Sequence, residues 1–170
     1  MQKIGTREIA AASMLGALSA LWEIIPGPPF DITFPLYHNI SWDVTGIPIM
    51  ISLLLYGPLC SIYTCLIGCS IIFLRGNISG GTLKLIAELA TLLGFALLRR
   101  NVVLNSTVAV AFRVAVMTIA NYYLLPLFYT MPQSYVAGLL ASIALFNVTQ
   151  ALINIVPSYI IYLRIRKLKR

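Results

Sequence analysis

Polar side chains that can bind a small molecule recur at helical spacing inside apolar stretches of the sequence. In the last stretch, Asn147, Gln150 and Asn154 are three and four residues apart, which places their amides on one helix face. Each amide both donates and accepts hydrogen bonds. Two earlier stretches carry comparable sets of polar residues: Lys84, Glu88, Thr91, Arg113, Thr118 and Asn121. If these stretches lie in hydrocarbon, which penalises an unpaired polar group, we expect the side chains to meet in one cavity.

Bonding between helices is the alternative for each of these residues, because Asn and Gln commonly bridge helices in membranes. Glu88 is one turn from Lys84 and can pair with it. Arg113 is expected to pair or to extend towards the membrane surface rather than to bind substrate. By depth along the helices, Glu88 and Asn121 belong to the outer half of the membrane and Asn147 to its middle.

The elements that must position these residues are membrane helices. The chain has 170 residues, of which 59% are hydrophobic and 10% are charged, with a mean hydropathy of +0.90. Such a composition predicts an all-α integral membrane protein, a single membrane-embedded domain over residues 1–170. Five acidic residues and one His offer little for hydrolysis or metal binding, and the net charge of +7 is too dispersed for nucleic acid. We therefore expect no catalytic residues, no metal and no cofactor.

Proline, glycine and charge divide the chain into six predicted transmembrane helices. The expected spans are residues 8–25, 44–56, 58–74, 81–98, 104–125 and 135–163. Six spans place nine of the 12 basic residues on the cytoplasmic side, with both termini cytoplasmic. These nine residues are Lys3, Arg7, Arg99, Arg100, Arg164, Arg166, Lys167, Lys169 and Arg170.

Two external loops are expected, at residues 26–43 and 126–134. The first is long and rich in proline, which suits a lid over a pocket open to the outside. A planar ligand would bury its ring among apolar side chains, with Phe34, Trp42 and Tyr122 as candidate stacking surfaces. Each of these aromatics can instead anchor the chain at the membrane boundary.

Small residues recur every four positions in the first predicted span, at Ala12, Gly16 and Ala20. Such a strip lets two helix backbones approach closely. The strip predicts either a partner interface or a contact inside the bundle, and the sequence alone does not choose between them.

Several strings in this order resemble the substrate-binding S components of energy-coupling factor (ECF) vitamin transporters, with the closest likeness to riboflavin-specific members. The strings are Asp43-Val44-Thr45-Gly46-Ile47-Pro48, Tyr56-Gly57-Pro58-Leu59, Glu88-Leu89-Ala90 with Gly94, Asn121-Tyr122-Tyr123-Leu124-Leu125-Pro126-Leu127, and Phe146-Asn147 ahead of Gln150. The resemblance covers nearly the whole chain.

The resemblance implies a six-helix protein of the cell membrane that captures a vitamin and passes it inward without catalysis. Its partners would be a transmembrane coupling subunit and two ATPases. Ala12, Gly16 and Ala20 would then form the partner interface. The positions matching Asn121 and Asn147 would bond the flavin ring, and Gln150 stands where Lys is usual. We expect the substrate site to comprise Asn121, Asn147, Gln150, Glu88, Asp43, Thr45 and Trp42.

Other functions remain open at this stage. The ligand can be another vitamin or a nucleobase-like compound, because a Gln amide offers both donors and an acceptor where Lys offers only donors. A stand-alone facilitator would also place polar residues within its spans, but would transport without an ATPase. The sequence contains no GxxxxGK[ST] motif, so we expect any ATP hydrolysis to come from partners.

Overall fold

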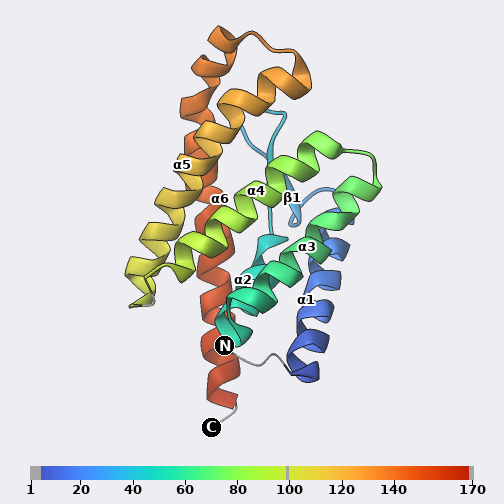
Figure 1. Cartoon of the computed structure of the whole chain (residues 1–170), viewed down its shortest axis with the longest axis vertical. Helices are drawn as coiled ribbons and strands as arrows, with labels where there is room; N and C mark the ends of the chain where they lie inside the picture. Colours follow the sequence, from blue (N-terminus) through green and yellow to red (C-terminus); the bar gives the residue numbers. More distant parts are fainter. Residues whose placement is uncertain (1–4, 99, 169–170) are drawn as a thin grey trace.

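The computed structural model describes residues 5–98 and 100–168, and six helices make up most of that part of the chain. The helices are α1 (Thr6–Ile24), α2 (Gly46–Tyr56), α3 (Pro58–Leu74), α4 (Ile78–Ala96), α5 (Val102–Tyr129) and α6 (Gln133–Leu168). A short hairpin of strands β1 (Asp31–Thr33) and β2 (Ser41–Asp43) stands between α1 and α2. Helix α1 begins and helix α6 ends at the same end of the bundle (Figure 1).

Local chemistry sets most helix boundaries. Gly57 has a φ of 88°, which ends α2, and Pro58 then occupies the first turn of α3, where a missing N–H costs nothing. The side chains of Asn77 and Asn101 cap α4 and α5, accepting hydrogen bonds from Gly80 N at 2.9 Å and Leu104 N at 2.8 Å.

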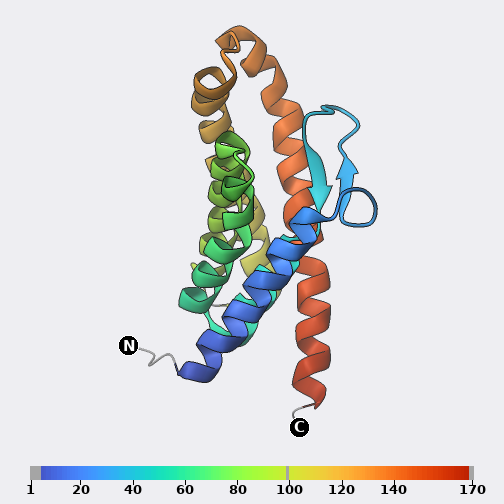
Figure 2. The same cartoon turned by 90° about the vertical axis from the view of Figure 1, so that its right-hand side faces the viewer.

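Helix α2 lies at the centre of the bundle. Its residues 46–53 are all buried, and it packs against α1, α3 and α6. Helices α4, α5 and α6 follow one another in space as they do in sequence, α4 against α5 and α5 against α6. Figure 2 shows the hairpin of β1 and β2 outside this bundle, beside the upper part of α6. The hairpin therefore lies beside the helices rather than among them (Figure 2).

Three of the described helices, α4, α5 and α6, are long and apolar enough to cross a membrane, and α2 and α3 are shorter apolar helices. The predicted set of six helices and the break at Gly57-Pro58 are confirmed. That all six span the membrane, and that both termini are cytoplasmic, stays a prediction. Lys3, Arg99, Lys169 and Arg170, which the charge argument uses, lie outside the described residues.

Two predicted loops differ in the structure. The predicted loop at residues 126–134 was placed wrongly at its start, because α5 continues through Pro126 to Tyr129 and α6 begins at Gln133. Proline is tolerated inside membrane helices where other groups satisfy the carbonyl it leaves unpaired. The loop at residues 26–43 is present, but it contains antiparallel pairs, among them Ile32 with Trp42, that sequence patterning did not indicate.

Candidate functional site

One cavity of about 430 Å³ lies between the hairpin and helices α1, α4, α5 and α6. Its polar and charged lining residues are Glu23, Tyr37, Asn39, Ser41, Asp43, Asn77, Lys84, Arg113, Asn121, Tyr129, Asn147 and Gln150. Apolar side chains, including Leu83, Met117, Leu125, Ile143 and Phe146, complete the wall. This mixture of an apolar wall and a few converging polar groups is typical of small-molecule sites.

The deepest charged groups form a one-to-one ion pair. Arg113 Nη1 lies 3.0 Å from Glu88 Oε1, and the two side chains are only 4% and 1% exposed. Arg113 also donates to Thr91 Oγ1 at 2.9 Å and, through Nε, to Asn147 Oδ1 at 3.0 Å. Asn154 Nδ2 donates to both oxygens of Glu88, at 3.0 and 3.1 Å. Glu88 therefore accepts every hydrogen bond that it makes, as an ionised carboxylate does.

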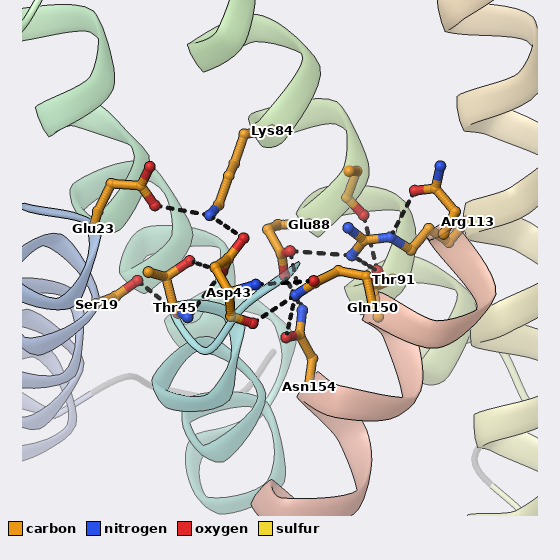
Figure 3. Close-up of polar contacts among 12 residues, drawn as sticks. Ser19, Glu23, Asp43, Thr45, Lys84, Glu88, Thr91, Arg113, Gln150 and Asn154 are labelled. Atoms are coloured by element: carbon orange, nitrogen blue, oxygen red, sulfur yellow. Dashed lines mark hydrogen bonds and ion pairs between the residues drawn. The ribbon is translucent and has the colours of Figure 1, made fainter. Parts of the chain in front are cut away.

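A second charged group lies closer to solvent. Lys84 Nζ contacts Glu23 Oε2 at 2.8 Å and Asp43 Oδ2 at 2.7 Å, and these side chains are 17–21% exposed. Thr45 donates to Asp43 through its backbone N–H and its hydroxyl (Figure 3). Burial alone would raise the pKa of the Asp43 carboxyl, but the Lys84 ammonium and the Thr45 hydrogen bonds hold that pKa below its usual value.

Gln150 ties the hairpin to α6. Its Nε2 donates to Asp43 O at 2.8 Å and to Asn154 Oδ1 at 3.0 Å, while its Oε1 accepts from Asp43 N at 3.1 Å. Both amide hydrogens are thus in use. A second tie is Trp42 Nε1, which donates to Thr149 Oγ1 at 2.8 Å. The structure therefore makes Gln150 an anchor of the hairpin at the cavity wall.

Arg113 and Asn121 each leave a polar atom of the deep wall available to a ligand. Within the described residues, every buried side-chain nitrogen and oxygen has a hydrogen-bond partner. Arg113 Nη2 and Asn121 Oδ1 make no hydrogen bond there, since Arg113 bonds through Nε and Nη1 and Asn121 through Nδ2 to Met117 O. These two atoms are therefore not enclosed by protein, and both residues line the cavity.

Four of the seven predicted substrate-site residues line the cavity: Asp43, Asn121, Asn147 and Gln150. The other three lie behind its wall. Glu88 is covered by its pairing with Arg113, Thr45 is buried beneath Asp43, and Trp42 bonds to α6. The alternative in which Glu88 pairs with Lys84 is not what the structure has, because Lys84 pairs with Glu23 and Asp43 across elements.

None of the three predicted stacking aromatics lines the cavity. Phe34 is 2% exposed and packs edge-on against Trp42 and Phe146, with ring centroids 5.0 and 5.5 Å apart. The cavity presents Phe146, Tyr37 and Tyr129 instead. The aromatic cluster thus fastens the hairpin to α6, which sequence position alone did not reveal.

The small-residue strip of α1 is used inside the bundle. Ala12 and Gly16 are buried, and Thr64 Oγ1 donates to Ala12 O at 3.1 Å. A Cβ on Gly16 would lie 2.8 Å from Cβ of Ile67 on α3. Ala12 and Gly16 therefore make a contact inside the bundle, which was the alternative to a partner interface. Ala20 is only half-buried. Binding of a partner at this strip stays a prediction.

The sequence reasoning missed Glu23 as a lining residue, and it expected Lys84 and Arg113 in the cavity group without including them in the substrate site. Their pairing partners lie 25 to 61 positions away, so no local spacing could identify them. One signal was available in the sequence. A charged side chain within an apolar helix is costly in free energy, so it is kept only where it has a partner or a cavity. Among the described residues, no group of three His, Cys, Asp or Glu side chains is placed to hold a metal.

Comparison with known proteins identifies the fold. No protein-family model matches the sequence, and no curated protein matches it. A solved structure of the S component of a bacterial ECF transporter is similar, with a TM-score of 0.82, 21% sequence identity, and coverage of 96% of this chain and 98% of that one. The chain therefore has the fold of that S component along nearly its whole length.

Proposed function

We propose that this chain is the substrate-capture subunit of an ECF-type transporter and that its ligand is a vitamin, with riboflavin or a related flavin as the first candidate. The observation that carries the proposal is the cavity lined together by Asn121, Asn147 and Arg113. The fold supports it, because the similar structure is itself an S component. At about 430 Å³ the cavity falls within the usual range of small-molecule sites.

The polar atoms of the cavity suit the edge of a flavin-like ring. Arg113 Nη2 offers N–H donors to a ring carbonyl, and Asn121 Oδ1 accepts from a ring N–H. Alternating carbonyl and N–H groups are what the uracil-like edge of a flavin presents. The ring itself would contact Phe146, Met117 and the neighbouring apolar wall.

The test is to purify the protein in detergent from riboflavin-replete medium and record its absorption spectrum. A flavin spectrum that is lost in Asn147→Ala or Asn121→Ala supports the proposal. The matched control is Asn105→Ala, because Asn105 is a buried amide of α5 that bonds to Arg100 N and does not line the cavity. A colourless protein that fails to bind added riboflavin would overturn the flavin assignment and redirect the search to other vitamins or nucleobase-like compounds.

We also propose that transport requires a transmembrane coupling subunit and two ATPases, with α1 docking on the coupling subunit. Ala20 is the position of the small-residue strip that is not fully buried. Ala20→Leu is expected to keep ligand binding but to lose co-purification with the coupling subunit. Gly16→Leu is unsuitable for this test because its side chain would collide with Ile67 inside the chain. Uptake into vesicles that contain this chain alone would instead identify a stand-alone facilitator.

A further inference from the structure

The charges around the cavity are unbalanced at its rim. Arg75 donates to the backbone oxygen of Glu23 at 3.4 Å, but among described residues Lys84 alone forms an ion pair with the Glu23 and Asp43 carboxylates, and it contacts both within 2.8 Å. All three side chains line the cavity. Their exposure of 17–21%, against 4% and 1% for Arg113 and Glu88, places them nearer to solvent than the deep pair.

The deep pair does not correct this imbalance. Arg113 is matched by Glu88, so its charge is already neutralised when a ligand arrives. At the rim, the two carboxylates of Glu23 and Asp43 share the single ammonium of Lys84, which leaves one negative charge in excess within this group. At a partly buried site such a charge is screened far less than it would be in water.

We propose that this rim selects the uncharged form of the ligand against its phosphate ester, with Glu23 as the specificity-determining residue. The inference rests on the proposed function, because it takes the ring to lie among the deep amides. Figure 3 shows Glu23, Lys84 and Asp43 together and apart from Arg113, and we take the polar tail of such a ligand to end beside these three residues, which also line the cavity. A phosphate on that tail would meet an excess of negative charge.

Lys84 does not offset this repulsion between the phosphate and the rim carboxylates. Lysine is a common phosphate-binding residue, but Lys84 Nζ could turn to a phosphate only by weakening its contacts with Glu23 and Asp43. Those carboxylates would then lose their cation beside an incoming dianion. Asp43 is also held in place by Thr45 and by the Gln150 tie, so it cannot move away without releasing the hairpin.

The experiment compares binding of riboflavin and riboflavin 5′-phosphate to the purified full chain by quenching of flavin fluorescence. At low ionic strength the phosphate ester is expected to bind at least about tenfold more weakly, the factor that a difference of ~1.4 kcal/mol produces. The difference between the two affinities should become smaller as salt is added. Glu23→Gln removes the excess charge and keeps a polar side chain, so it should also make this difference in affinity smaller.

Asp31→Asn is the matched control, because Asp31 is an exposed carboxylate of the same hairpin that does not line the cavity. It should leave the ratio of the two affinities unchanged. Binding of riboflavin by Glu23→Gln itself verifies that the variant is folded. Lys84→Gln, as a second variant, should widen the difference.

The outcomes separate the two proposals. Equal or tighter binding of the phosphate ester, with Lys84 serving as its ligand, would leave the flavin assignment in place and overturn the inference alone. An equal effect of Glu23→Gln and Asp31→Asn would also overturn it. If neither flavin binds, the flavin assignment fails and the inference fails with it.

Discussion

The two ion-paired regions of the cavity differ in their burial and in how their charges are paired. In the deep region, Arg113 and Glu88 are nearly sealed from solvent and pair one to one. At the rim, Lys84 is shared by Glu23 and Asp43, and all three are partly exposed. The deep pair joins α4 to α5, and Asn154 adds α6 to it. The rim group joins α1 and α4 to the hairpin.

We call the Arg113–Glu88 pair and the polar side chains around it the floor, and the hairpin that Lys84 contacts the cover. The difference in burial indicates that the floor is rigid and that the cover can be released. A sealed pair surrounded by Thr91, Asn147 and Asn154 has one satisfied arrangement, because every departure leaves a charge without a partner. The rim group holds an edge element by contacts that water can replace. We therefore expect fixed atoms of the deep region to recognise the ligand, and the rim to govern its entry and selection.

The largest expected effect comes from breaking the deep pair on one side. Glu88→Leu should lower the free energy of unfolding by about 3–5 kcal/mol, because it leaves the Arg113 charge buried without compensation. Thermal unfolding in detergent measures the loss. The double variant Glu88→Leu with Arg113→Met removes both charges and should recover much of the stability. A double variant as unstable as the single one would show that the deep pair is not a self-contained unit.

Breaking the rim group should cost less stability and release the cover. Lys84→Met leaves two carboxylates without their cation, a loss of about 1–3 kcal/mol for groups of this burial. Limited proteolysis should then cut residues 26–43 faster than in the unmodified protein. Lys167→Met, an exposed basic residue at the far end of α6, is the control and should leave the cleavage rate unchanged. Equal cleavage in both variants would mean that Lys84 does not hold the hairpin.

Gln150 tests the border between the two regions, because it touches Asn154 of the floor and Asp43 of the cover. Gln150→Ala removes three hydrogen bonds and should lower the free energy of unfolding by about 1–3 kcal/mol, since each bond is worth about 1 kcal/mol net and water in the cavity can replace part of them. Its main expected result is faster ligand dissociation, measured by stopped-flow fluorescence. An affinity loss as large as that of Asn147→Ala would instead make Gln150 a direct ligand contact.

The sequence predicted the floor better than the rim, for a physical reason. Asn147 and Gln150 share a helix face by the helical period alone, and Asn121 lies in the preceding apolar stretch; all three line the cavity. Helix breaks at Gly57-Pro58 are likewise local, since they depend on one residue's backbone conformation. Features of this kind are encoded within a few residues.

The pairings could not be predicted because they join residues distant in sequence. Spacing offered only Glu88 to Lys84, one turn away, whereas the fold gives Lys84 to Glu23, 61 positions earlier. The role of Trp42 was missed for the same reason, since its partner Thr149 is 107 positions away. Gly46 shows how strict such placements are: a Cβ there would overlap the amide of Asn154, which holds Glu88. Which polar groups meet is decided by helix packing.

The smallest expected effect is a response of the rim to acid. The Asp43 carboxyl has a pKa below its usual value in the folded protein. Its contribution to stability is therefore complete above the unfolded-state pKa of about 3.9 and is lost as the pH falls through the lower folded-state pKa. Thermal unfolding in detergent should show little change through Asp43 from pH 7 to about pH 5, and a loss only below about pH 4.

Asp43→Asn should remove that part of the acid dependence, because its amide carries no charge to titrate. The matched control is Asp31→Asn, which alters an exposed carboxylate on the facing strand and should keep the full dependence. If Asp43→Asn lost stability with acid as steeply as the unmodified protein, the Lys84 contact would not be what lowers the Asp43 pKa. The rim would then be held chiefly by the uncharged ties of Gln150 and Trp42, and the contrast between a shared ion pair at the rim and a sealed one-to-one pair in the deep region would have to be abandoned.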